Sequence, residues 1–400
     1  MYFRHTAERL LEHCASCFAD PAERLKFLQR ATAWSVDREH GPQVGKALGW
    51  AVKRQQIGRK LLPAGALAIL IGNASAAAVV LQGSWGRTAP APMAQRNWRA
   101  KAAGSNSSIP ENIWLVETTR TFDLYSNGLR VENEFATGTE TRKYRVWPRS
   151  GGDVWRIRSV PAGIVFHTTE SHIAPFEEDQ NQQLRRAGEG LLEYVSRKKS
   201  YHFVIDRFGR VYRIVSESDR ANHAGHSIWA DRNWVYIDLN ESFFGVAFEA
   251  RTRPDDGPAP LNSAQVHAGR ILTDMLRARY EIPPENCIGH GQVSVNPGSR
   301  QAAYHTDWAA HLPFRELGLP DNYSQPLPSI VLFGFTADAS FANNASPVLR
   351  QALLVAEDEI KQKAAAHNVP VERYRQSLQQ TYQERTRALV SGAIHQENYP

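Results

Sequence analysis

The chain has 400 residues, enough for one to three domains, and its 42% of apolar residues can fill a sizeable core. A net charge of +6 without a concentrated run of lysine and arginine suits an anionic polymer or a membrane surface, and it argues against nucleic-acid binding. Three cysteines exclude a disulfide framework, and Cys14 and Cys17 are interpreted as two core-facing helix positions.

The first part of the chain is predicted to be a basic helical region, residues 1–60, followed by an apolar segment, residues 61–82. Basic residues precede this segment, residues 61–81 carry no charge, and small residues follow, which is the layout of a secretory signal. The segment is predicted to be a cleaved signal, a signal-anchor whose basic side stays in the cytoplasm, or a buried alanine-rich helix. The first two alternatives place the rest of the chain outside the cytoplasm, in the periplasm or cell envelope, with or without membrane anchoring through residues 61–82.

Two short regions precede the main folded part. Residues 83–112 are rich in proline, alanine, glycine, serine and asparagine and are predicted to be a linker. Residues 113–160 alternate like strands, and Ser126-Asn127-Gly128 is typical of a hairpin turn. They predict a small β extension, either a module of its own or extra strands on the sheet that follows.

Strands and helices then alternate over residues 155–320, which predicts an α/β fold with a mixed central β-sheet flanked by helices. One helix is expected at about 179–199, with a buried stripe formed by Leu184, Ala187, Leu191 and Val195, and another at about 263–280. Residues 346–400 predict a helical tail that Ser346 caps, with Pro347 at its first position. The tail is expected either to pack on the main body or to bind a partner. The fold class is therefore α/β with helical N- and C-terminal extensions.

Candidate chemistry lies in two pieces of this main part. The apolar strand Gly163–Thr169 delivers His167 near its end, and a buried strand can hold such a side chain rigidly. His290 follows a second apolar pair, and His305 and Asp307 come 15 and 17 residues later. Two histidines and one carboxylate leave the fourth position of a tetrahedral zinc open, as in catalytic sites. Because the chain has 14 histidines, spacing alone also permits a chance grouping.

Residues 155–316 resemble the zinc-dependent N-acetylmuramoyl-L-alanine amidase family, amidase type 2, which includes the peptidoglycan recognition proteins. The resemblance is carried by stretches in the family's order: Ile164 to Thr169, Tyr201 to Tyr212, Ala221 to Ser227, Asn240 to Val246, and Gly289-His290. It implies that His167 and His290 are zinc ligands. It also implies Asp307 as the third ligand, with His305 at the position of the family's catalytic lysine. The alternative is His305 as ligand and Asp307 as the residue that orients it.

The resemblance implies further roles around the metal. Tyr201 matches the family tyrosine near the zinc and is expected to donate to the oxyanion, while His305 is a second donor or the acid that protonates the leaving amine. Glu249 is the nearest candidate for the glutamate that some members use, although the family position lies closer to Ala247. His223 is expected to contact the glycan or lactyl group, beside Asn222, which stands where tryptophan is usual.

The function that the resemblance implies is zinc-dependent hydrolysis of the amide between N-acetylmuramic acid and L-alanine, with peptidoglycan or muropeptides as partners. One alternative is a module that binds peptidoglycan without cutting it, because such relatives lose a ligand. Another is a zinc amidohydrolase acting on a different amide, which the missing lysine and the insertion at 291–304 keep open.

Overall fold

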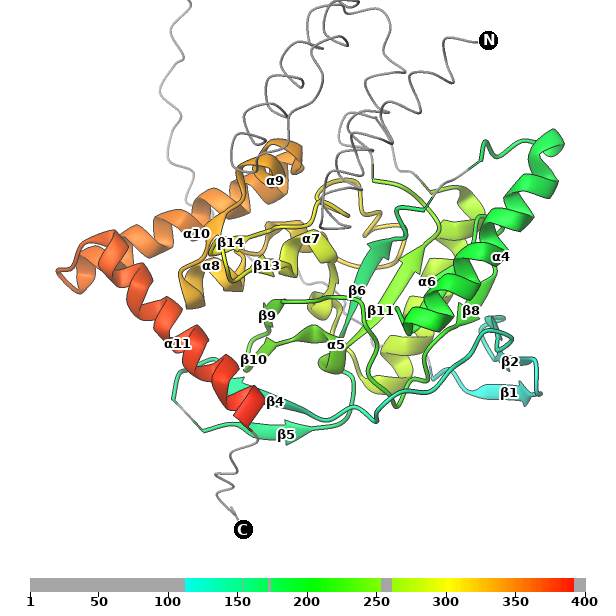
Figure 1. The fold of residues 1–400 in the computed structure, drawn as a ribbon, viewed down its shortest axis with the longest axis horizontal. Helices are drawn as coiled ribbons and strands as arrows, with labels where there is room; N and C mark the ends of the chain where they lie inside the picture. The colour runs from blue at the N-terminus through cyan, green and yellow to red at the C-terminus, as the bar shows by residue number, and fades with distance from the viewer. Residues whose placement is uncertain (1–111, 153, 172–173, 253–260, 392–400) are drawn as a thin grey trace, which may run out of the picture. The chain divides into compact units, whose positions relative to one another are not determined.

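The computed structural model describes residues 112–152, 154–171, 174–252 and 261–391 (Figure 1). The predicted helical region 1–60, the apolar segment 61–82 and all but the last residue of the predicted linker 83–112 lie outside these ranges. Among the described helices, none is long and apolar enough to span a membrane. The signal or signal-anchor at 61–82 therefore stays a prediction.

A sheet of eight strands forms the centre of the described structure, in the order β1-β2-β3-β8-β7-β11-β6-β12. Its strands are β1 (Leu115–Thr118), β2 (Phe122–Tyr125), β3 (Arg130–Glu132), β8 (Val211–Arg213), β7 (Phe203–Ile205), β11 (Phe243–Phe248), β6 (Gly163–Thr168) and β12 (Cys287–Gly289). The last four are parallel neighbours, whereas β7 and β8 form an antiparallel hairpin. The predicted mixed sheet is confirmed, and its parallel part brings several strand carboxyl ends to one edge.

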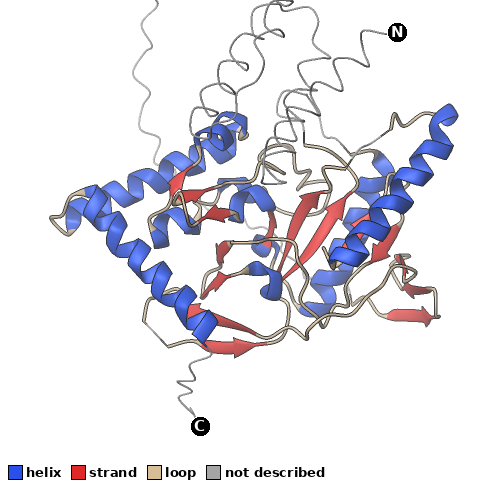
Figure 2. Ribbon diagram, in the orientation of Figure 1, coloured by secondary structure: helices blue, strands red, loops and turns tan. Residues whose placement is uncertain are grey.

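Helices cover both faces of this sheet (Figures 1 and 2), because its central strands are apolar on both sides. Those next to the sheet are α4 (Asn181–Lys198) and α6 (Ser263–Tyr280), with the short helices η1 (Glu178–Gln180), α5 (Leu239–Ser242) and η2 (Pro284–Asn286) in the loops. Leu272 of α6 packs with Phe166 on one face, and Leu192 of α4 packs with Ala247 on the other. A capping box between Asn262 and Gln265 starts α6 where the sequence predicts it.

The predicted buried stripe of α4 is correct at its ends and wrong in its middle. The buried positions are Leu184, Gly188, Leu192 and Val195, not Ala187 and Leu191. A helical period of 3.6 residues permits either set. The backbone at Gly188 lies against the Glu249 carboxylate, since a Cβ built there would be 3.7 Å from it. The observed set places Gly188, and not Ala187, on the buried face beside Glu249.

The predicted β extension divides between two sheets. Strand β3 pairs in parallel with β8, so β1 to β3 extend the central sheet. The rest contributes to a smaller antiparallel sheet with the order β5-β4-β10-β9. These strands are β5 (Arg156–Arg158), β4 (Tyr144–Pro148), β10 (Trp234–Ile237) and β9 (Ile228–Ala230). Val146 and Tyr236 pack against Val165, so the small sheet covers the β6 face that also carries His167.

The C-terminal part forms a layer of helices with a third, small sheet. Its elements are α7 (His290–Val293), β13 (Val295–Asn296), β14 (Gln301–Ala302), η3 (Asn322–Ser324), α8 (Pro328–Phe333), β15 (Thr336–Ala337), α9 (Ala339–Asn344), α10 (Pro347–Ala366) and α11 (Val371–Ser391). Ser346 caps α10 and Pro347 opens it, as predicted. Arg145 of β4 donates to the Ala388 carbonyl of α11, and the Arg385 guanidinium lies 5.5 Å from the Trp147 ring. Of the two predicted arrangements, the helices adopt the one packed on the main body.

Candidate metal centre

The carboxyl ends of β6 and β12 lie side by side and carry the two histidines. In this parallel pair Gly289 is aligned with Phe166, so the next residues, His290 and His167, are also neighbours. Their ring centroids are 4.6 Å apart, and both side chains are buried. The register of two short apolar strands is therefore what brings together two residues that are far apart in the sequence.

Glycines on both sides of His290 let a distant loop approach it. A Cβ at Gly289 would lie 2.9 Å from the Trp308 Cβ, and one at Gly291 would lie 3.1 Å from the Asp307 carbonyl oxygen. Real Cβ atoms are rarely so close to other atoms, so the glycines make this packing possible. The Gly291 amide also donates to the Asp307 carbonyl at 3.0 Å. The loop is thus held by its main chain, which leaves the Asp307 side chain directed at the histidines.

The Asp307 carboxylate faces one nitrogen of each histidine. Its Oδ1 and Oδ2 lie 2.9 and 3.0 Å from His290 Nδ1, and Oδ2 lies 3.4 Å from His167 Nδ1. One potential ligand atom from each of the three residues falls within 4.8 Å of the others, and all three residues are buried. The predicted convergence of these three side chains is present in the structure.

The hydrogen bonds behind His167 fix which nitrogen faces Asp307. His223 Nε2 lies 3.3 Å from the Phe243 carbonyl, which can only accept, so this nitrogen carries the proton. His223 Nδ1 then accepts from His167 Nε2 at 3.1 Å. The lone pair of His167 is consequently left on Nδ1, the atom that faces Asp307. This chain of hydrogen bonds orients His167 in the way that hydrogen-bond partners outside the coordination sphere orient metal-bound histidines.

His290 follows the same logic with a different partner. Its Nε2 lies 3.4 Å from the Ala224 carbonyl, which is again an acceptor, and its Nδ1 faces Asp307. The loop that carries Ala224 is held by Asn240, whose Oδ1 accepts from the His223 and Ala224 amides at 2.8 and 2.7 Å. One asparagine therefore positions the partners of both histidines.

The electrostatics of the cluster follow from burial and from its single carboxylate. Burial lowers the pKa of His167 to about 4, so this ring is neutral near pH 7. Burial also opposes a charge on His290, but Asp307 outweighs it and raises the pKa of His290. Burial alone would raise the pKa of Asp307, whereas the two histidines together hold it well below its usual value. When no metal ion is bound, a proton on His290 therefore balances the negative charge of the Asp307 carboxylate.

The donor set fits a divalent cation. Two imidazole nitrogens with lone pairs and one ionised carboxylate converge on one point, and a cation there would replace the proton on His290. Two nitrogens and one oxygen are ligands that zinc accepts, and three protein ligands leave a coordination position free.

Tyr201 lies at the wall of the cluster. Its ring centroid is 5.1 Å from that of His167, and its backbone has a φ of +63°, a left-handed conformation that bulky residues rarely adopt. Burial, and then Asp307, raise the pKa of its phenol, so the hydroxyl keeps its proton and can donate a hydrogen bond. Backbone strain of this kind persists where the surroundings enforce it, often at functional sites.

His305 lies over the cluster but not in it. Its ring stacks on His290 with centroids 4.6 Å apart and planes at 21°, and the side chain is exposed. The group of potential ligands contains Asp307 and not His305. The geometry thus favours Asp307 over the rival assignment, and it leaves the His305 ring at the open side of the site.

The other predicted site residues are spread more widely. His223 packs against Gly245, where a Cβ would lie 2.6 Å from its ring, and it contacts His167, so it is a partner of the cluster as well as a predicted substrate contact. Asn222 is exposed and donates to the Lys198 carbonyl at 3.1 Å. Glu249 is buried, which raises its pKa, and it accepts from the Arg207 amide at 3.0 Å. None of its described contacts is with the cluster.

Comparison with known proteins agrees with this geometry. Residues 158–306 match the family model for N-acetylmuramoyl-L-alanine amidase. These residues resemble an amidase type 2 domain, and because of this resemblance they are called the amidase domain below. The match includes both histidines and ends one residue before Asp307.

Two curated relatives resemble parts of the amidase domain. The chain is 32% identical over 89 residues to the N-acetylmuramoyl-L-alanine amidase AmiD of Escherichia coli, which is 21% of this chain and 31% of AmiD. It is 27% identical over 125 residues to the 1,6-anhydro-N-acetylmuramyl-L-alanine amidase AmpD of Haemophilus influenzae, which is 30% of this chain and 60% of AmpD. The chain thus spans less than two thirds of either relative. Among solved structures, AmpDh3 of Pseudomonas aeruginosa aligns over 49% of this chain and 90% of its own, with 21% identity and a TM-score of 0.33.

A buried arginine from outside the amidase domain contacts the core of that domain, and no pattern in the sequence predicts this contact. Arg142 is almost fully buried and lies 2.9 Å from His202 Nε2, while His202 Nδ1 accepts from the Gly245 amide at 3.0 Å. The guanidinium also donates to the carbonyls of Glu217 and Glu241, at 3.2 and 2.6 Å. Burial, followed by the charge of Arg142, lowers the pKa of His202. These contacts support the strand segment on which His223 packs.

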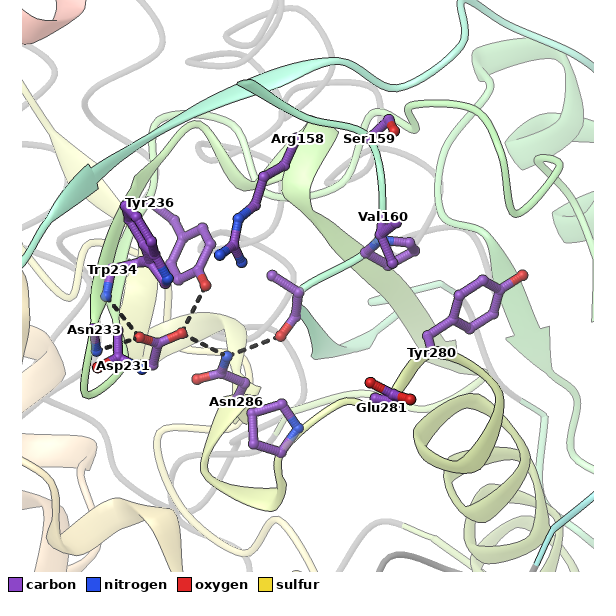
Figure 3. Close-up of a pocket in the computed structure, with 13 residues that line it drawn as sticks. Arg158, Ser159, Val160, Asp231, Asn233, Trp234, Tyr236, Tyr280, Glu281 and Asn286 are labelled. Carbon is purple, nitrogen blue, oxygen red and sulfur yellow. Dashed lines mark hydrogen bonds between the residues drawn. The ribbon is translucent and has the colours of Figure 1, made fainter. Parts of the chain in front are cut away.

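A cavity of about 580 Å³ lies at the opposite, amino end of β6 in the amidase domain (Figure 3). Its wall includes Asp231, which accepts hydrogen bonds from the Tyr236 hydroxyl at 2.6 Å and from the Asn233 and Trp234 amides at 2.7 Å each. Asn286 lies between Asp231 and the Ala162 carbonyl, to which it donates at 2.8 Å. These bonds hold the turn between β9 and β10 against the start of β6.

Proposed function

We propose that this protein is a zinc-dependent amide hydrolase that cleaves the bond between N-acetylmuramic acid and L-alanine in peptidoglycan or its fragments. The observation that carries the proposal is the set of two imidazole Nδ1 atoms and one carboxylate that converge on one buried point, inside and at the end of an amidase type 2 domain. The names of the two curated relatives support the substrate class.

The residues of the chain divide the chemistry among them. When bound, zinc supplies a Lewis acid that polarises the scissile carbonyl and makes water acidic enough to act as a nucleophile near neutral pH. His167, His290 and Asp307 would hold the ion, and His223 keeps the lone pair of His167 directed at it. Tyr201 retains its proton and donates to the oxyanion that develops on the substrate carbonyl. His305, exposed over His290, would deliver a proton to the leaving amine, and its stacking on His290 supports this role.

We further propose that the enzyme acts outside the cytoplasm, in the periplasm or cell envelope. The support is the signal-like pattern of residues 61–82 together with the substrate class, since peptidoglycan lies beyond the cytoplasmic membrane. Localisation of a tagged full-length chain by cell fractionation tests this, and recovery in the cytoplasmic fraction alone would contradict it.

The decisive experiment is mass spectrometry of the products that form when the purified, zinc-loaded protein is incubated with muropeptides. The expected products are the free stem peptide and the peptide-free sugar. Binding without any product would instead indicate a recognition module, and cleavage at another bond would indicate an amidohydrolase of different specificity. Soluble fragments and intact cell wall are tested in parallel to define the substrate.

The third ligand is tested separately by metal analysis. Asp307→Ala is expected to lose stoichiometric zinc, whereas His305→Ala is expected to keep it and to lose activity. The reverse result would make His305 the ligand and Asp307 the residue that orients it.

A further inference from the structure

We propose that Phe341 of α9, in the C-terminal extension, positions the loop that carries Asp307 and thereby sets the affinity of the site for its metal. Phe341 is a positioning residue in this view, because it touches neither substrate nor metal. The inference rests on the proposed metal centre. It adds that the amidase domain does not complete this centre alone, since Phe341 lies beyond the family match at residues 158–306.

The first support is the packing around Gly291, the residue after His290. Phe341 is fully buried, and a Cβ at Gly291 would lie 2.6 Å from its Cε2 atom. The same Cβ would lie 3.0 and 3.1 Å from the carbonyl oxygens of His305 and Asp307. The Phe341 ring and the main chain of the loop that carries Asp307 therefore both pack against the Cα atom of Gly291. Removal of the ring would leave a space beside the loop into which it could shift.

The second support is that residues around Phe341 hold the loop at both of its ends. Strand β14, at the start of the loop, pairs with β15, and the Asp338 amide donates to the Ala302 carbonyl at 3.0 Å. The Gln301 side chain donates to the Asp338 carboxylate, also at 3.0 Å. At the other end, the Ser346 amide donates to the Ala309 carbonyl at 3.0 Å. The two anchors lie on either side of Asp307.

The third support is the backbone of the loop itself. Ala303 and Trp308 have φ values of +58° and +57°, and neither of them is glycine. Left-handed conformations of such residues cost roughly 1 kcal/mol each. They persist only where the surroundings enforce them. A loop with two such residues needs an external support, and the described structure provides it from residues 336–346.

The test compares Phe341→Ala with Phe333→Ala in the full-length protein. Phe333 is equally buried in the same extension, but its ring packs on Tyr382, 5.6 Å away between centroids. Both substitutions remove the same atoms from a core, so both are expected to lower the melting temperature. Zinc affinity, measured by competition with a chromogenic chelator, separates them. Phe341→Ala is expected to weaken zinc binding at least roughly 10-fold, as loss of outer support does at other zinc sites. Phe333→Ala is expected to stay within about 2-fold of wild type by the same comparison.

Equal zinc affinity in the two variants would overturn the proposal while leaving the metal centre intact. A wild-type protein that binds no zinc would overturn both. If Phe341→Ala does not fold, Phe341→Leu and Gly291→Ala replace it, because the first shortens the support and the second pushes against it. Weakened zinc binding in these two variants supports the proposal, and unchanged binding in both overturns it.

Discussion

An aspartate from another segment lies near each end of β6, and the two aspartates differ in the hydrogen-bonding groups that face them. Asp231, at the amino end, accepts from two main-chain amides and from the Tyr236 hydroxyl, all of which carry permanent protons. Asp307, at the carboxyl end, faces the Nδ1 atoms of His167 and His290, and the first of these carries a lone pair. Asp231 therefore accepts from groups of the protein that always carry a proton. Asp307 faces a lone pair on His167, and His290 balances its charge only when that ring is protonated. The first arrangement holds a fold together, whereas a carboxylate and a lone pair that face each other indicate a binding site for a cation.

The largest effect is expected at the carboxyl end, from His290→Ala. This change removes one of three ligands, so zinc content and activity should both be lost while the fold survives. Atomic emission and circular dichroism measure the two, and treatment of the wild type with a chelator should reproduce the loss of activity. Zinc at full stoichiometry in the variant would remove His290 from the site.

Tyr201→Phe should retain zinc and lose roughly 10²-fold in rate, because an oxyanion donor contributes about that much. The measurement is kcat with zinc saturating, and zinc content serves as the control. An unchanged rate would leave Tyr201 with a packing role only.

Asp231→Ala is expected to lower stability without affecting zinc binding, which is the opposite of the effect expected for His290→Ala. Loss of hydrogen bonds to a charged acceptor is expected to lower the free energy of unfolding by about 2 kcal/mol. Zinc affinity should not change, because the cavity end of β6 is separated from the cluster by the length of the strand. Urea denaturation and chelator competition measure the two quantities. A variant that loses zinc affinity would show that the two ends are coupled.

The loss of stability at acid pH is also expected to come from the histidines near the carboxyl end of β6. The pKa of His167 is lowered to about 4, and burial lowers the pKa of His202 and His223 as well. An unfolded histidine titrates near 6.5, so the unfolded chain binds more protons between about pH 6.5 and pH 4, and stability falls as the pH falls through that window. The raised pKa of His290 opposes this trend, because its contribution is present below pH 6.5 and is lost as the pH rises.

The melting temperature of the metal-free protein is expected to drop by roughly 5–10 °C between pH 7 and pH 5, given the size of such shifts and the usual response of melting temperature to stability. His167→Gln should reduce this slope, and Asp231→Ala should leave it unchanged. A slope that survives in His167→Gln would assign the acid sensitivity to other groups.

The sequence could predict those parts of the site that depend on local pattern. His167 lies near the end of one apolar strand and His290 follows another, and these strands pair in parallel with Gly289 aligned with Phe166. Asp307 was predicted as a ligand from the resemblance. The backbone conformation that brings its side chain to the two histidines could not be predicted. Its loop uses left-handed residues that are not glycine, and such conformations leave no mark on composition.

Contacts between distant segments account for most of what was missed. The role of His223 as the partner of His167 depends on the Phe243 carbonyl, a backbone atom whose position no motif encodes. Helices α8 and α9 were not predicted, since they are only six residues long and are stabilised by packing. The middle of the α4 stripe was also wrong, because a helical period of 3.6 residues permits more than one buried set and tertiary packing decides between them.

The buried guanidinium of Arg142 bears on how this protein could be rearranged by evolution or by design. Arg142 lies between β3, which continues the central sheet, and β4 of the smaller sheet, and both strands precede the family match. From there its guanidinium contacts His202 in the core. A segment cut at residue 158 would expose the edge of β8 and leave the His202 imidazole without its cationic neighbour. The segment that the family model matches therefore depends on the chain before it, and a fusion or transplant that is to remain folded must include the upstream strands.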